Sequence, residues 1–195
     1  SQAAIAGVLF WIVGAIPAPD PRHMLNARRL PMLDRFSVLA IVAAQQALAQ
    51  SGLSFENGGH RTGCVVGVGT AGGEAIEELY RKMYLDGAKR ANVFTVPRVM
   101  PSAPASQISM AYGIRGPVVT VSSACASSNH AIATAVWLLR NSVIDAAIVG
   151  GTEAPLTYGI LKAWEAMRVM APDTCRPFDR QRKGLVLAEG AGMVV

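Results

Sequence analysis

Apolar residues along the chain follow two different spacings, which alternate. Short and nearly continuous apolar runs predict buried strands, at residues 64–69, 118–121, 146–149 and 190–195. Longer stretches with apolar residues at helical spacing predict helices, at residues 34–50, 74–86, 103–112, 126–141 and 160–167. Gly52, Gly87 and Gly113 follow three of these helices and are typical helix stops.

The order of these elements predicts the architecture. Unbroken apolar strands separated by helices favour a mostly parallel sheet that is covered on both faces, so we expect an α/β fold. Residues 5–16 are expected to add one or two short strands before the proline-rich segment 17–21, which forces an extended loop. Since the last run begins a strand where a domain boundary would have a polar linker, we expect the fold to be incomplete.

The segment around Cys125 carries the clearest candidate chemistry. A β-branched strand leads through small residues to the thiol, and a long apolar-periodic stretch follows. This order predicts a strand, a tight turn and a helix whose first turn holds Cys125. Free amides and the positive end of the helix dipole would favour a thiolate there. The alternative is a buried structural cysteine, and spacing alone leaves both interpretations open.

A glycine pattern offers a different chemistry. Gly67, Gly69 and Gly72 follow a strand and precede a helix, as in dinucleotide-binding proteins, where glycines let the backbone approach a pyrophosphate. A tight strand-to-helix turn explains the same glycines. No second strand ending in an acidic residue follows, which argues against a nicotinamide cofactor.

The histidines do not complete a nucleophilic pair. His130 lies five residues after Cys125, so on one helix the two side chains point in different directions. We expect His130 to be an ordinary helix residue with a satisfied hydrogen bond. His23 and His60 lie in predicted loops, and the sequence therefore assembles no convincing Cys–His pair.

Composition narrows the class of protein. Only 16% of the 195 residues are charged, which suggests that a partner, another subunit or a missing part of the chain covers much of the surface. The net charge of +5 suits an acidic partner, but scattered basic residues and 6% aromatics argue against nucleic acid. The sequence has an odd number of cysteines, and their spacing is not that of metal ligands: Cys64, Cys125 and Cys175. This favours a reducing compartment. The apolar stretch 3–17 is too short to span a bilayer and lacks a basic leading segment, so we expect a cytoplasmic protein without a membrane partner.

A charged turn, residues 176–184, precedes the final predicted strand. It is either a solvated loop or a buried ionic anchor in which a neighbouring arginine holds Asp179.

Several segments together resemble one family. Residues 121–128 resemble the nucleophile motif of the β-ketoacyl-acyl-carrier-protein synthases, type II in particular, which belong to the thiolase superfamily. Further blocks agree in the same order, at residues 32–36, 112–117, 150–154, 176–179 and 189–192. The resemblance identifies residues 1–195 as the N-terminal part of such a synthase, truncated at both ends.

This resemblance implies a fold and a reaction. The thiolase-like fold has two similar halves in an α-β-α-β-α layering, of which the chain would cover about one incomplete half, and members usually form homodimers. Acyl carrier protein brings the acyl group on its phosphopantetheine, and no further cofactor or metal is implied. The acyl group moves to a cysteine thiol, and decarboxylation of malonyl-carrier protein gives the carbanion that attacks the thioester.

The resemblance also implies roles for individual residues. Cys125 would accept the acyl group and donate its backbone N–H to the oxyanion. Met100 would gate the acyl pocket and Trp164 would line it, although both could be plain core residues. The carrier protein would dock on basic side chains that otherwise only solvate the surface: Arg28, Lys89, Arg90 and Arg168.

Two departures from the family limit these expectations. The catalytic histidines, a lysine and a glycine-rich oxyanion loop of the family lie in a second half that this sequence lacks, and the opening strand is also missing. The chain alone is therefore expected to accept an acyl group at most. The alternatives are a non-catalytic chain-length-determining partner subunit, which usually lacks the nucleophile, and a dinucleotide-binding oxidoreductase.

Overall fold

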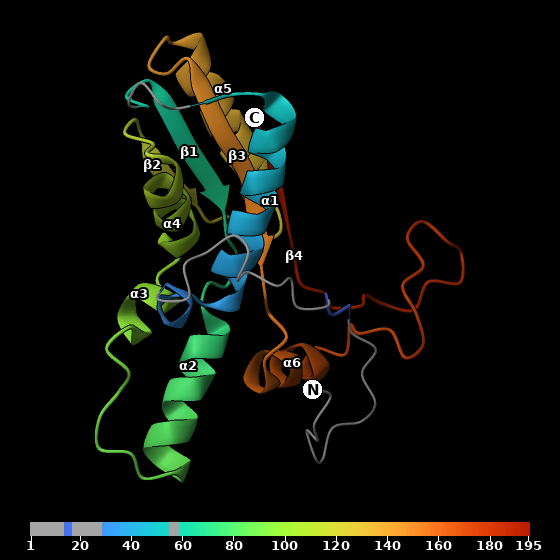
Figure 1. The fold of residues 1–195 in the computed structure, drawn as a ribbon. Coiled ribbons are helices and arrows are strands. Elements are labelled where there is room, and N and C mark those ends of the chain that lie inside the picture. Colours follow the sequence, from blue (N-terminus) through green and yellow to red (C-terminus); the bar gives the residue numbers. More distant parts are fainter. Residues whose placement is uncertain (1–13, 17–28, 55–58) are drawn as a thin grey trace.

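The computed structural model describes residues 14–16, 29–54 and 59–195, which form a four-stranded sheet with helices on both faces (Figure 1). The strand order is β2-β1-β3-β4. β1 pairs in parallel with β2 and with β3, whereas β4 runs antiparallel to β3. The bounds are β1 Thr62–Gly67, β2 Val118–Val121, β3 Ala146–Glu153 and β4 Gly190–Val194.

Alternate residues of β1 belong to two separate cores. Cys64 and Val66 pack with α1 (Arg35–Ser51) and α4 (Ala103–Tyr112) on one face of the sheet. Val65 packs with α5 (Ser127–Arg140) on the other face. All of β1 is buried, because helices cover both sides of this central strand. The expected α/β architecture is confirmed.

A group of helices lies beyond the ends of β1 and β3 (Figure 1). α2 (Gly73–Tyr80) continues into a π-helical segment, η3 (Arg81–Leu85), and packs against α6 (Tyr158–Ala166). The carboxylate of Glu77 accepts a hydrogen bond of 3.1 Å from the amide of Gly159, which links these two helices. The short α3 (Thr95–Val99) and the 3-10 turn η2 (Leu30–Met32) complete the described helices.

An ion pair joins the beginning and the end of the described chain. Arg35, at the start of α1, hydrogen-bonds both carboxylate oxygens of Glu189 and donates to the carbonyl of Ile16 at 2.7 Å. The amide of Ile16 donates to the same carboxylate at 2.9 Å. Burial is the largest single effect and would raise the pKa of Glu189, but the hydrogen bonds from Arg35 and from the amide of Ile16, together with the charge of Arg35, outweigh it and hold this pKa below its usual value.

Several helices and strands lie where the sequence predicts them. Both α4 and β2 have the predicted bounds, and α1 ends at Gly52 in a left-handed conformation (φ 67°), as a glycine stop requires. Within the expected strands at 5–16, Gly14 forms an isolated bridge to Ala188; most of that segment lies outside the described residues.

Other expectations are wrong in detail. β3 does not close at Gly150 and Gly151 but runs through them to Glu153. The sheet has an antiparallel edge strand, β4, which an apolar run cannot reveal. The helix predicted at 74–86 changes from α to π geometry at Arg81, and α3 was not expected at all.

Candidate active site

Cys125 lies in the turn between β2 and α5, before the helix begins. The helix starts at Ser127 with Ala126 as its N-cap, so the prediction that the first helical turn holds the thiol is wrong by two residues. Ala124 has a positive φ of 52°, a left-handed conformation that turns the chain sharply just before the thiol. Cys125 is exposed as a result.

The hydroxyl of Ser127 holds this turn closed. It accepts a hydrogen bond of 2.8 Å from the amide of Ser123 and donates one of 2.6 Å to the carbonyl of Ala124. Ser127 is buried, so these bonds are partly shielded from water. The turn is thereby fixed on both sides of Cys125.

Two glycines of the sheet let the turn approach closely. A Cβ built on Gly67 would lie 2.5 Å from backbone atoms of Ser127 and Ser128. A Cβ on Gly151 would lie 1.9 Å from the hydroxyl oxygen of Ser128. The start of α5 therefore rests directly on the backbone of β1 and β3.

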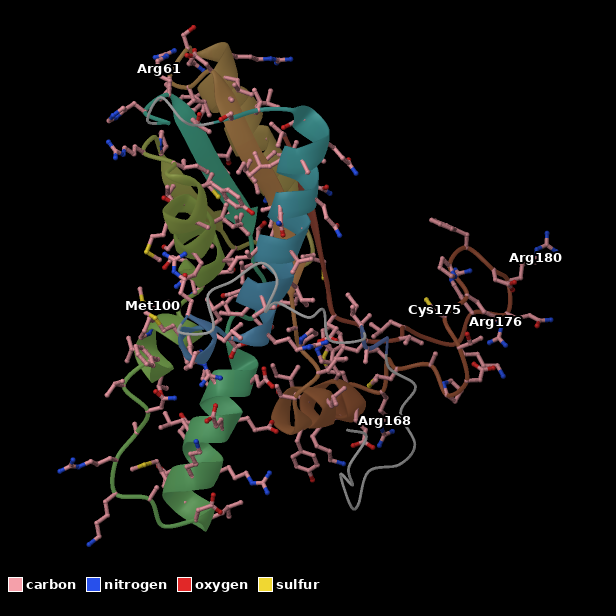
Figure 2. The ribbon with its side chains drawn as sticks, viewed as in Figure 1. Arg61, Met100, Arg168, Cys175, Arg176 and Arg180 are labelled. Atoms are coloured by element: carbon pink, nitrogen blue, oxygen red, sulfur yellow. The ribbon has the colours of Figure 1, made fainter. Side chains whose placement is uncertain are left out.

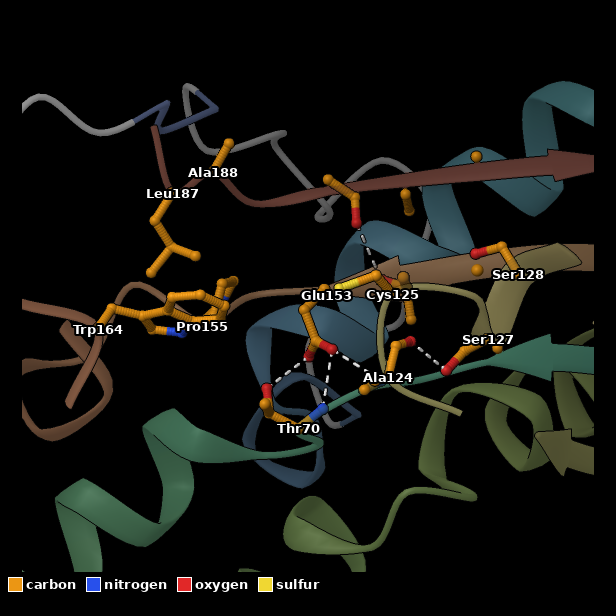
Figure 3. A pocket seen from close by; sticks show the side chains of 17 residues that line it. Thr70, Ala124, Cys125, Ser127, Ser128, Glu153, Pro155, Trp164, Leu187 and Ala188 are labelled. Atoms are coloured by element: carbon orange, nitrogen blue, oxygen red, sulfur yellow. Dashed lines mark hydrogen bonds between the residues drawn. The ribbon is translucent and has the colours of Figure 1, made fainter. Parts of the chain in front are cut away.

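Cys125 opens into a pocket of about 620 Å³ (Figure 3). Trp164 of α6 lines the same pocket, at the far end from Cys125 in the view of Figure 3. The other lining residues are mostly small or apolar: Gly67, Gly69, Thr70, Ala124, Ser127, Ser128, Gly151, Thr152, Glu153, Pro155, Leu187, Ala188, Gly190, Ala191 and Gly192. Such a lining suits an apolar chain attached to the thiol.

Glu153 is the one carboxylate among these lining residues, and the sequence analysis does not predict a role for it. It stands at the end of β3, and its side chain accepts hydrogen bonds from the amides of Gly69 and Thr70 at 2.7 and 2.8 Å. It also accepts a bond of 2.9 Å from the hydroxyl of Thr70. The acidic residue after the glycine pair of β3 was the only available signal in the sequence.

The environments of the three thiols differ. Cys64 lies in β1, and burial raises the pKa of its thiol to about 12, which makes it inert at neutral pH. Cys175 is exposed in the long segment between α6 and β4, at a distance from the sheet (Figure 2). Cys125 alone among the three lines the pocket.

The histidine expectation is confirmed. His130 lies in α5, and its Nδ1 hydrogen-bonds the hydroxyl of Ser123 at 2.7 Å. No histidine of the described part of the chain lines the pocket, and His23 lies outside that part.

The glycines of the dinucleotide-like pattern contact protein. Gly67 lies against the backbone that follows Cys125, at Ser127 and Ser128, and a Cβ on Gly72 would lie 2.4 Å from the carbonyl of Arg98. The amides of Gly69 and Thr70 already donate to a carboxylate, so the loop does not offer them to a phosphate. The tight-turn interpretation of this pattern therefore holds.

The other predicted site residues that the structure describes are not among those lining the pocket. Met100 ends α3, is 47% exposed and is not among the residues lining the pocket (Figure 2). Lys89 and Arg90 are exposed between η3 and α3, and Arg168 is exposed after α6. Arg28 lies outside the described residues.

The charged turn at 176–184 is a solvated loop. Arg176 pairs with Asp173 on the surface, and Asp179 accepts a hydrogen bond from the amide of Gln181. The arginine Arg182 reaches only the carbonyl of Asp179, not its carboxylate. The partly buried ionic anchor of this region is instead Glu189 with Arg35.

The described residues contain neither a membrane-spanning helix nor a metal-binding cluster. None of their helices has the length and apolar character needed to cross a membrane. They also contain no cluster of three or more His, Cys, Asp or Glu side chains that could hold a metal ion.

Comparison with known proteins agrees with the geometry. Residues 17–195 match the family model described as "Beta-ketoacyl synthase, N-terminal domain". The chain is 54% identical to "Nodulation protein E" of Rhizobium sp. (strain N33), over 94% of this chain and 46% of that protein. It is 35% identical to "3-oxoacyl-[acyl-carrier-protein] synthase 2" of Staphylococcus aureus, over 87% of this chain and 43% of that protein.

A solved structure shares the fold. It is described as "AntDE:AntF (apo): type II PKS acyl-carrier protein in complex with its ketosynthase bound to the hexaketide". The TM-score is 0.81 at 23% identity, and the alignment covers 94% of this chain and 52% of that chain. The described residues thus have the thiolase-like fold of ketosynthases, and the chain spans less than half the length of the two curated relatives above.

Proposed function

Since the chain belongs to the β-ketoacyl synthase family and contains its N-terminal domain, we propose that it is the nucleophile-bearing part of a condensing enzyme. The natural-length protein takes an acyl group from acyl carrier protein and extends it with malonyl-carrier protein. The observation that carries this proposal is the exposed Cys125 thiol, which is held in a tight turn at the mouth of an apolar pocket.

The first half of the reaction uses groups of this chain. The Cys125 thiolate attacks the carbonyl carbon of the acyl thioester, and the negative charge that develops on the carbonyl oxygen is stabilised by the backbone N–H of Cys125. The carbon–sulfur bond to phosphopantetheine then breaks, the carrier thiol leaves, and the acyl group stays on Cys125. The start of α5 adds the positive end of its dipole beside the thiolate.

The second half of the reaction needs further residues. Loss of carbon dioxide from the malonyl group leaves a carbanion that attacks the Cys125 thioester and releases the thiolate. Groups that stabilise this carbanion are expected outside the described residues, since none of their histidines lines the pocket. We expect no cofactor or metal beyond the carrier phosphopantetheine.

The carrier protein is the proposed partner. Acyl carrier protein is acidic, and the chain has a net charge of +5 with exposed basic side chains at Lys89, Arg90 and Arg168. Arg28 is the fourth proposed contact. Trp164 is the proposed wall of the acyl site, and Met100, which does not line the Cys125 pocket, is its proposed gate. Such docking should weaken as salt concentration rises.

We propose that the protein forms a homodimer. Its proposed location is the cytoplasm. β2 is the edge of the sheet opposite β4, and Val118 and Val119 are more than a third exposed there. An unpaired edge strand with apolar side chains is suited to pairing with a second copy. Sedimentation of the natural-length protein tests this assembly, and a monomer at all concentrations would refute it.

The alternative of a non-catalytic chain-length-determining subunit is disfavoured, because such subunits usually lack the nucleophile that this chain retains. The high identity to the nodulation protein favours a specialised acyl product, used in nodulation, over general fatty acid synthesis. Deletion of the gene in its own organism separates these two roles. Normal growth with impaired nodulation supports a specialised acyl product, whereas a growth defect that added fatty acids repair supports general fatty acid synthesis.

The proposed reaction is tested by mass spectrometry after incubation with an octanoyl-pantetheine thioester. One acyl group is expected on Cys125, and none is expected in the Cys125→Ala variant. Cys175→Ala is the matched control because it removes another exposed thiol outside the pocket. Equal acylation of wild type and Cys125→Ala would contradict the proposal.

A further inference from the structure

The side chain of Glu153 connects two walls of the pocket, the end of β3 and the loop after β1. It ends β3, while Gly69 and Thr70 belong to the loop that follows β1. Its carboxylate accepts three hydrogen bonds from that loop, at 2.7, 2.8 and 2.9 Å. Figure 3 shows these bonds beside Cys125, and all of these residues line the pocket.

The loop depends on Glu153 for its shape. The amides of Gly69 and Thr70 have no other hydrogen-bond acceptor among the described residues. Ala71, the next residue, has a positive φ of 66°, a conformation that a non-glycine residue adopts only when its surroundings hold it. Without the carboxylate, two backbone donors beside a strained residue would lose their only protein acceptor and be left to bind water, which does not fix the loop.

The other side of the loop is already fixed. A Cβ on Gly72 would lie 2.4 Å from the carbonyl of Arg98, so the loop cannot retreat toward α3. A Cβ on Gly69 would lie 2.5 Å from the carboxylate of Glu153, so the carboxylate sits directly against the loop backbone. Glu153 and α3 therefore hold the loop between them.

We propose that Glu153 is a positioning residue, which holds Gly69 and Thr70 in place as the pocket wall that binds the acyl chain delivered to Cys125. This inference rests on the proposed function for the identity of the occupant. Glu153 acts on the binding of a long apolar chain and not on the reactivity of the thiol. Loss of its hydrogen bonds should therefore weaken long-chain binding and leave a small reagent unaffected.

The test uses alkylation of Cys125 in the natural-length protein, followed by mass spectrometry. Iodoacetamide reports thiol reactivity alone, and N-octyl iodoacetamide adds a chain that must occupy the pocket. The preference for the octyl reagent is the alkylation rate with N-octyl iodoacetamide divided by the rate with iodoacetamide. Glu153→Ala is expected to lower this preference by about tenfold, the effect of losing a charge-assisted hydrogen bond. Its rate with iodoacetamide should stay within about twofold of wild type.

Two further variants separate positioning from stability. Glu153→Gln keeps an acceptor oxygen for the two amides and should lie closer to wild type than Glu153→Ala. Asp145→Ala removes a carboxylate that binds Arg61 on the surface, at the opposite end of the sheet (Figure 2), and should leave the preference unchanged. All rates are taken at a temperature where circular dichroism shows each variant to be folded.

The outcomes are distinct for the two proposals. An unchanged octyl preference in Glu153→Ala, or equal losses with both reagents, overturns the role of Glu153. Absence of acyl transfer from octanoyl-pantetheine in the wild type overturns the proposed function instead, since alkylation does not depend on that reaction.

Discussion

At the scale of single residues, burial decides which polar groups are reactive and which are structural. Cys64 and Cys125 are the same side chain, but burial in β1 keeps the first protonated while the second is open to the pocket. Ser127 is buried, and its hydroxyl shapes the turn through its bonds to the amide of Ser123 and the carbonyl of Ala124. Asp34, before α1, is buried with one oxygen bonded to the amide of Ala75 and the other unpaired.

Removal of the Ser127 hydroxyl should loosen the nucleophile turn. Ser127→Ala leaves the amide of Ser123 without its acceptor and removes one of the two hydrogen bonds to the carbonyl of Ala124, which keeps the bond from the amide of residue 127. We expect a cost of about 1–3 kcal/mol in the free energy of unfolding. We expect slower acylation of Cys125 as well as a lower melting temperature. The matched variant Ser109→Ala also loses one hydroxyl–carbonyl bond, to Ile114, but away from the pocket. It should reduce stability only; equal acylation rates in both variants would refute the role of Ser127.

Asp34 should make stability depend on pH. Burial raises the pKa of this carboxyl from 3.8 to about 6, so the folded state binds its proton more tightly than the unfolded state does. The contribution of this proton binding to the stability of the folded state is therefore fully present below pH 3.8 and is lost as pH rises to about 6. The free energies of unfolding of wild type and Asp34→Asn, measured in urea across this range, check the prediction. The variant should gain stability relative to wild type as pH rises, and the difference between the two free energies should be constant above about 6.5. A difference that is constant at every pH would contradict the prediction.

At the scale of elements, glycines decide how closely the nucleophile turn approaches the sheet. Gly67 and Gly151 contact the start of α5, and a Cβ on Gly150 would lie 1.9 Å from the carbonyl of Gly192 in β4. The glycine pair in β3 thus does not end the strand. It lets α5 approach β3 on one side and β4 pair with it on the other.

A side chain at position 67 should displace the nucleophile. Gly67→Ala places a Cβ against backbone atoms of Ser127 and Ser128, which cannot move without shifting Cys125. We expect a loss of about 1–3 kcal/mol in the free energy of unfolding, together with slower acylation. Gly159→Ala is the matched control, because nothing lies within 4 Å of its added Cβ in α6. Acylation of Gly67→Ala at the wild-type rate would refute the argument.

The elements that the sequence predicts correctly are those with a local signal. The bounds of α4 follow from helical spacing and the stop at Gly113, and those of β2 from its β-branched run. The continuation of β3 through Gly150 depends on its neighbours across the sheet, and so does the direction of β4. Cys125 could be singled out for the same local reason, whereas Glu153 could not, since its role exists only where β3 meets the loop after β1.

At the scale of the whole molecule, the exposed apolar surface explains the composition. Trp137 of α5 is 61% exposed, and Ile132, Val136 and Leu139 of the same helix are more than a third exposed. The low charge content predicts that further protein covers part of the surface, and the exposed apolar side chains of α5 are where we expect that contact.

The 195-residue chain alone should therefore fall short of condensation. With no histidine of the described residues at the pocket, we expect acyl transfer to Cys125 without decarboxylation of malonyl-carrier protein. Turnover assays on the purified chain, with carbon dioxide release as the readout, check this. Formation of the extended product at a rate above that of Cys125→Ala would contradict it.

The ion pair of Arg35 with Glu189 has a consequence for synthesis on the ribosome. The two residues are 154 positions apart in the chain. At typical translation rates, Arg35 waits about 10–30 s before its partner is made. During that interval α1 has emerged, while the edge of β3 that receives β4 is still unpaired. The pairing of β3 with β4 therefore waits for residues 189–194 to be made, and a pause in translation before them would prolong the period in which this edge of β3 is exposed.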